Sequence, residues 1–99
     1  MAEAILESVG DGYYRVRGAL TFETVSALLR ASEPMFQGPE ANLELDFGEV
    51  QRSDSAGLAL LIEWLCNARA AGKSIRFHRV SAQMRAIAQV SDLEGILPI

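Results

Sequence analysis

An alternation of extended and helical patterns along the chain constrains the fold more than any other feature. Two short stretches, 4–8 and 13–18, flank the turn sequence Gly10-Asp11-Gly12 and are expected to pair as a β-hairpin. Further strands are expected at 42–47 and 74–80, and helices at about 21–32, 55–71 and 81–90. Because strand–helix–strand successions require parallel crossovers, the order β-β-α-β-α-β-α predicts an α/β fold with a mixed sheet and helices mainly on one face.

The length and composition limit the chain to one globular domain, residues 1–99. A chain of 99 residues has room for a single core, and its 49% apolar and 22% charged residues are ordinary for a folded domain. The single Cys66 excludes an internal disulfide, and together with one histidine, His78, it does not make the usual kind of zinc site. We therefore expect neither a metal nor a cofactor.

The net charge of −4 is unevenly distributed. Residues 1–63 hold four Arg against eleven Asp or Glu, whereas residues 64–91 hold five basic and no acidic residues. The overall acidity argues against nucleic-acid binding, and the basic segment indicates a solvated face or a contact for an acidic partner. The start lacks the pattern of a secretory signal, and the apolar run 56–62 is far shorter than the ~20 residues of a membrane span. A cytoplasmic protein without direct membrane insertion is expected.

The first helix, expected to begin with an N-cap at Thr21, has four apolar residues at helical spacing. The residues expected to face the sheet are Phe22, Val25, Leu28 and Leu29. Pro34, Gly38 and Pro39 then predict a loop. Within it the sequence leaves open whether Met35 and Phe36 cover the core or touch a partner.

Small polar residues lie where the third strand ends and the long helix begins. Ser53, Asp54 and Ser55 are placed there by the pattern, and Asp54 or Ser55 can cap the free amides of the first helical turn. A phosphate on Ser55 would also be stabilised at a helix N-terminus. The residues alone leave both roles open, with capping the simpler one.

The long helix predicts a docking patch for another protein. Its main apolar face contains Leu58, Leu61, Ile62 and Leu65 and is expected to contact the core. Leu60 and Trp64 lie roughly 110–150° from the centre of that face and are expected to be partly exposed. With Gly57 allowing close approach, they would anchor a partner. Coverage by a loop or by the apolar tail, which is expected to pack on the body, is the alternative.

The candidate residues supply no catalytic or metal site. Nucleophilic catalysis by Ser55 needs a base within reach, and His78 lies in an expected strand. Asp46, Glu49 and Asp54 match no metal-ligand spacing. The chain is therefore expected not to be an enzyme.

Two segments carry a resemblance to a known family. Arg52-Ser53-Asp54-Ser55-Ala56-Gly57-Leu58, between an alternating strand and an apolar helix, resembles the signature of STAS domains, which include the anti-sigma-factor antagonists. Gly18-Ala19-Leu20-Thr21-Phe22-Glu23-Thr24 resembles the second landmark of that family, between strand two and helix one. The order and length of the elements are similar over essentially the whole chain.

The resemblance implies two alternative functions. MlaB-type proteins bind the cytoplasmic ATPase of a phospholipid ABC transporter and support its activity, which implies peripheral attachment at the inner face of the inner membrane through the partner complex. In the antagonists, the serine that matches Ser55 is phosphorylated by a partner anti-sigma kinase, and the phosphate breaks a complex. Antagonists typically have an acidic residue at the position of Thr21 and a glycine at that of Ala59, so the MlaB-type alternative is favoured. The expected partner-binding residues are Ser53, Asp54, Ser55, Gly57, Leu60 and Trp64, with Ser55 as the candidate phosphorylation site.

Overall fold

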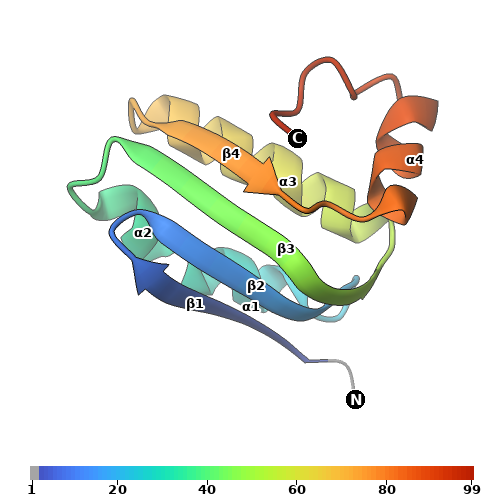
Figure 1. Cartoon of the computed structure of the whole chain (residues 1–99), viewed down its shortest axis with the longest axis horizontal. Helices are drawn as coiled ribbons and strands as arrows, with labels where there is room; N and C mark the ends of the chain where they lie inside the picture. The colour runs from blue at the N-terminus through green and yellow to red at the C-terminus, as the bar shows by residue number, and fades with distance from the viewer. Residues whose placement is uncertain (1–2) are drawn as a thin grey trace.

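The computed structural model describes residues 3–99 and contains a four-stranded sheet in the order β1-β2-β3-β4 (Figure 1). β1 (Ala4–Gly10) pairs antiparallel with β2 (Tyr13–Leu20), and the tight turn between them has Gly12 at a φ of 78°, where glycine is favoured. β3 (Asn42–Ser53) pairs in parallel with both β2 and β4 (Ser74–His78). The expected hairpin and mixed sheet are confirmed.

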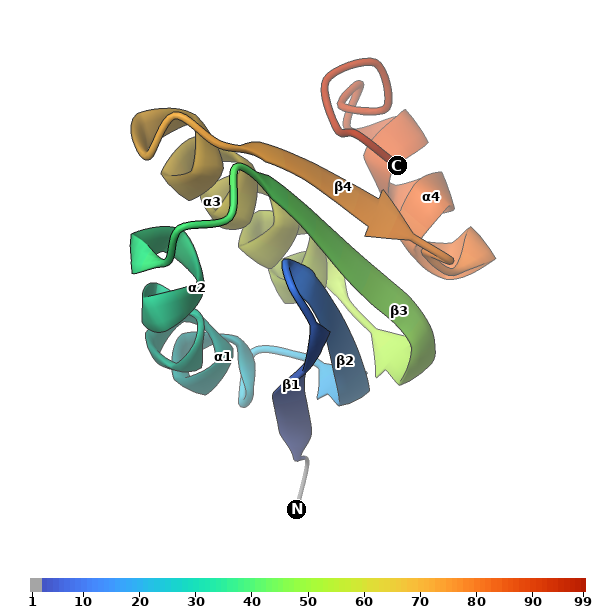
Figure 2. The ribbon, with the colours of Figure 1, turned by 60° about the vertical axis from the view of Figure 1, so that its left-hand side comes forward.

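Three helices lie on one face of this sheet. They are α1 (Val25–Ala31), α2 (Glu33–Gln37) and α3 (Ser55–Ala70), and Figure 2 shows all three on the same side of the strands. The fourth helix, α4 (Ala82–Val90), lies beyond the carboxyl ends of the parallel strands, next to the start of α3 (Figure 1). The expected α/β architecture, with its helices mainly on one face, is therefore confirmed.

The short helix α2 occupies a segment for which the sequence predicts a loop. Pro34 lies in its first turn, where a proline needs no N–H partner and its fixed φ suits a helix, so this residue starts the helix instead of preventing it. Gly38 follows the last residue of α2 in an extended conformation and ends it. Met35 is 3% exposed and belongs to the core, whereas Phe36 is half-buried.

The core lies between the sheet and α3. Leu43, Leu45 and Phe47 of β3 are buried, and Glu44 and Asp46 alternate with them on the opposite face of the sheet. This alternation is the pattern of a strand with one face in the core and one face toward solvent. It gives the sheet an inner apolar face and an outer charged face.

The C-terminal tail packs on the body, as the sequence predicts. The backbone N–H of Phe77 in β4 donates to the carbonyl oxygen of Pro98 at 3.0 Å. Leu97 is 5% exposed and joins the hydrophobic cluster. The tail therefore covers part of the outer edge of β4.

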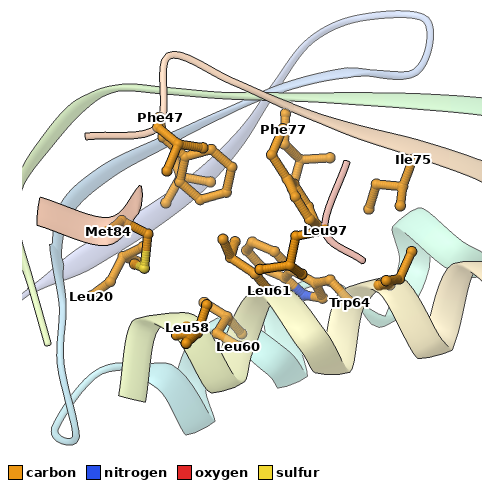
Figure 3. Close-up of a cluster of buried hydrophobic side chains, with 14 of the residues drawn as sticks. Leu20, Phe47, Leu58, Leu60, Leu61, Trp64, Ile75, Phe77, Met84 and Leu97 are labelled. Atoms are coloured by element: carbon orange, nitrogen blue, oxygen red, sulfur yellow. The ribbon is translucent and has the colours of Figure 1, made fainter. Parts of the chain in front are cut away.

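Trp64 lies in the middle of the core. Its side chain is 0% exposed and points from α3 toward Phe47 and Phe77 of the sheet (Figure 3). The centroids of its ring and that of Phe47 are 6.2 Å apart, and its indole N–H donates to Ser32 Oγ at 2.8 Å. Because Ser32 separates α1 from α2, this one side chain connects both short helices, α3 and the sheet.

The predicted exposure of Leu60 and Trp64 is therefore wrong. Leu60 is only 1% exposed. Gly57, Trp64 and Ala68 fall within about 40° of arc on the helix, and all three are buried. The centre of the buried face of α3 therefore lies near two small residues, Gly57 and Ala68. The sequence-based prediction counts only large aliphatic side chains, so it places the centre of the buried face too far around the helix.

We predict that Ser32→Ala lowers the free energy of unfolding by about 1–3 kcal/mol, because the buried indole N–H of Trp64 then has no acceptor. Urea unfolding followed by tryptophan fluorescence measures this change. Ser26→Ala, at an exposed position of α1, is the matched control and should change the free energy by less than about 0.5 kcal/mol. Equal unfolding midpoints for the two variants would show that this hydrogen bond contributes nothing.

Candidate docking surface

The start of α3 is capped as the sequence predicts. Asp54 Oδ1 accepts from the backbone N–H of Ala56 at 2.8 Å, and the side chains of Asp54 and Ser55 are exposed. Ser53, by contrast, is 6% exposed and ends β3 opposite Leu20 of β2. Of the three polar residues, Asp54 and Ser55 are therefore available to a partner and Ser53 is not.

Gly57 serves packing inside the molecule. A β-carbon at this position would lie 2.7 Å from Met84 Cε and 3.0 Å from Leu20 Cβ. Both distances are shorter than ordinary contacts, so the missing side chain lets α3 approach the end of β2 and the first turn of α4. The expectation that Gly57 lets a partner approach closely is wrong, because the side of Gly57 that lacks a side chain faces Met84 and Leu20 in the core.

The segment between β2 and α1 places an aromatic side chain on the surface. Thr24 Oγ1 donates to the carbonyl oxygen of Ala19 at 2.7 Å and accepts from the backbone N–H of Thr21 at 3.0 Å. These bonds hold the segment as a turn, so α1 begins at Val25 rather than at Thr21. Phe22 therefore points to solvent with 86% of its surface exposed, and the prediction that it faces the sheet is wrong.

A groove runs between α3 on one side and α1 and α2 on the other. Its first half, with a volume of about 390 Å³, is mainly apolar and lined by Phe22, Val25, Leu29, Ala56, Ala59 and Leu60, with Ser55 at its end. Its second half is more polar and includes Arg30, Glu33, Phe36, Gln37, Asn67 and Ala70. Leu29 and Glu63 line both halves, so the two depressions lie next to each other along α3. We call this surface the α1–α3 groove.

The six residues expected to bind a partner are thus divided between surface and core. Asp54 and Ser55 lie at the open end of α3, and Leu60 forms part of the floor of the groove although it is almost fully covered. The other three are buried. Sequence reasoning missed the exposure of Phe22, which depends on the turn held by Thr24, and the central place of Glu63, which depends on how α1 packs beside α3.

The outer face of the sheet carries charges that neutralise one another. Ion pairs cross between neighbouring strands from Arg15 to Glu7 at 3.2 Å and from Arg17 to Glu49 at 2.9 Å. Beyond the end of β4, Arg79 donates two hydrogen bonds to the carboxylate of Asp46. This face also holds His78, which pairs with Glu44, so the histidine is on the opposite side of the sheet from α3.

Within residues 3–99, no three His, Cys, Asp or Glu side chains come together as a metal-binding group. In the same part of the chain, no helix is long and apolar enough to span a bilayer.

We predict that the folded protein loses stability in acid because the carboxylate of Asp46 becomes protonated. The hydrogen bonds from Arg79 and from the backbone N–H of Gly48 lower the pKa of Asp46 from 3.8 to about 2, against the opposing effect of desolvation. Since the folded pKa lies below the unfolded value, the ionised carboxylate stabilises the fold above about pH 4, and this contribution disappears as the pH falls toward 2.

Urea unfolding of wild type and Asp46→Asn at several pH values tests this prediction. The variant should be less stable near neutral pH, and the difference should shrink below about pH 4. Asp92→Asn, at an exposed position near the C-terminal tail, is the control and should follow wild type. A difference between wild type and Asp46→Asn that does not depend on pH would contradict the assignment.

Comparison with known proteins identifies similar sequences and folds. The family model described as "Mlab, STAS domain" matches residues 9–98. Among solved structures, the anti-sigma factor antagonist SpoIIAA in its unphosphorylated form has a TM-score of 0.73 and 21% identity, over 93% of this chain and 83% of that one. The phosphorylated form of SpoIIAA, a Bacillus cell fate determinant, has a TM-score of 0.68 and 24% identity, over 93% and 86%. No curated protein matches the chain in sequence.

Proposed function

The chain belongs to the MlaB group of STAS domains, and we propose that it is an accessory subunit that binds and regulates the cytoplasmic ATPase of a phospholipid ABC transporter. STAS domain families are generally non-catalytic regulatory proteins that act by contacting partner proteins. In this proposal the chain makes and breaks no covalent bond. Its effect on the ATPase comes from binding energy alone.

The observation that carries the proposal is the exposure of Phe22 beside Ser55. Both residues lie in the two segments that resemble the STAS landmarks, and both line the first half of the α1–α3 groove. An aromatic side chain with 86% of its surface exposed gains free energy when a partner covers it, and such residues often dominate protein interfaces. Ala56 and Ala59 beside it leave room for a partner to approach closely.

Binding at this surface can regulate an ATPase through its conformations. A subunit that binds one conformation of the ATPase more tightly than another shifts the population toward the first. The size of the shift is limited by the difference between the two affinities. The groove is formed by packed helices, so it offers a preformed surface to one conformation of the partner.

We predict that Phe22→Ala weakens binding to the ATPase subunit of the phospholipid transporter of the same organism by at least about tenfold, equivalent to roughly 1.4 kcal/mol. Ser55→Arg should weaken it as well, because a long cation would occupy the end of the groove. The dissociation constant is measured with the two purified proteins by isothermal titration calorimetry.

Val90→Ala is the matched control for the aromatic truncation. Val90 is an 89% exposed apolar residue of α4, away from the groove, and its truncation should leave the dissociation constant unchanged. The proposal fails if wild type does not bind the ATPase. It also fails if Phe22→Ala and Ser55→Arg bind as tightly as Val90→Ala.

A phosphorylation-switched antagonist of an anti-sigma kinase is the second candidate function. It is favoured by the exposure of Ser55 at the first position of a 16-residue helix and by the likeness of the fold to both forms of SpoIIAA. A phosphate there would add almost two negative charges beside the carboxylate of Asp54. The same groove end would then become much more anionic and release a partner.

This alternative predicts a phosphorylated fraction of the protein in its native cells. Intact-mass spectrometry should find a species heavier by one phosphate group, and Ser55→Ala should abolish it. Ser91→Ala, at another exposed serine, is the control and should retain it. Absence of the heavier species from wild type under growth and starvation alike would speak against the kinase function and leave the transporter proposal untouched.

A further inference from the structure

From the α1–α3 groove we infer that the ATPase binds through an amphipathic α-helix, laid along both halves of the groove, with a basic side chain that pairs with Glu63. The inference rests on the proposed function and deepens it. It specifies the secondary structure, the length and one charge of the partner segment. None of these follows from the exposure of Phe22 and Ser55 alone.

The walls of the groove decide the secondary structure of the occupant. α1 and α2 form one wall and α3 forms the other, and helical backbone N–H and C=O groups bond within their own helices. A partner strand would find no free backbone edge here, so side chains must make the contact. An amphipathic helix that lays its apolar face into a groove binds in this way.

The length of the groove fits several turns of helix. The lining residues of α3 run from Ser55 to Ala70, which is about 22 Å at 1.5 Å per residue. Along α3 they form a single stripe, with steps of three or four positions except for the adjacent pair Ala59 and Leu60: Ala56, Ala59, Leu60, Glu63, Asn67 and Ala70. A partner helix of about four turns would cover this stripe from end to end.

The difference in polarity between the two halves of the groove predicts which part of the partner helix carries apolar side chains and which part carries polar ones. The first half of the groove requires apolar side chains opposite Phe22 and Val25, whereas the second half accepts polar ones. Glu63 lies at the junction of the two halves. Its carboxylate would therefore lie under the middle of the partner helix.

Within residues 3–99, no counter-ion pairs with Glu63. The ion pairs among residues 3–99 lie on the outer face of the sheet, and Arg30, in the same half of the groove, does not pair with Glu63. A covering helix would remove water from this carboxylate, and an unpaired charge in an interface is costly. A lysine or arginine on the partner would compensate for the lost hydration and exclude helices that carry an acid there.

Isothermal titration calorimetry with the purified ATPase subunit tests this inference by comparing the dissociation constants of variants in which the charge of Glu63 is reversed or removed. We expect Glu63→Arg to raise the dissociation constant about tenfold or more, Glu63→Gln to raise it less, and added salt to reduce the difference between wild type and Glu63→Gln. Glu94→Arg makes the same charge change at an exposed position in the tail and should bind like wild type.

A separate variant tests whether the partner occupies the second half of the groove. Ala70→Trp should fill that half and weaken binding, while Val90→Trp, at an exposed position of α4 away from the groove, should not. Thermal unfolding of each variant verifies that it folds. Replacing one basic residue of a surface helix of the ATPase with glutamate should restore binding to Glu63→Arg.

The outcomes separate this inference from the function on which it rests. If wild type does not bind the ATPase, the proposed function fails and the inference fails with it. If Phe22→Ala weakens binding but Glu63→Arg binds as tightly as Glu94→Arg, the function stands and the paired charge is refuted. If Ala70→Trp binds like Val90→Trp, the partner contacts only the first half and the four-turn helix is refuted.

Discussion

The position of Trp64 determines the arrangement of the rest of the molecule. Its ring fills the space between α3 and the sheet, and its N–H reaches Ser32 at the junction of α1 and α2. Because a buried indole N–H needs an acceptor, α1 and α2 are held at a defined place beside α3. The two walls of the α1–α3 groove follow from that placement. A core interaction thus shapes the surface proposed for the partner.

The two faces of the molecule differ in how their charges are satisfied. On the outer face of the sheet, cross-strand ion pairs such as Arg17–Glu49 leave little for a partner to neutralise. In the groove, Glu63 has no ion-pair partner in the described part of the chain, and Phe22 is exposed. Both proposed functions use this second face, but only the phosphorylation-switched alternative changes the charge at Ser55. The family relationship and the geometry therefore point to the same end of α3.

The order of the strands and helices could be predicted because it depends on short-range patterns. Alternating burial in β3, the cap at Asp54 and the turn at Gly12 each involve residues close together in the chain. The helix α2 was missed because Pro34 is compatible with a first helical turn as well as with a loop. Local sequence does not distinguish these two roles, since packing of Met35 into the core selects one of them.

The sequence by itself determined the alternation of elements, the two STAS landmarks and the exposed, capped start of α3 at Asp54 and Ser55. Only the tertiary structure decided which side of α3 faces solvent, because the buried arc depends on the sheet and on α1 and α2 together. Trp64 went to the core for that reason, whereas Phe22 went to the surface because the turn held by Thr24 makes α1 begin at Val25. Whether a large apolar side chain is covered is a property of its neighbours in space, which a helical period alone does not specify.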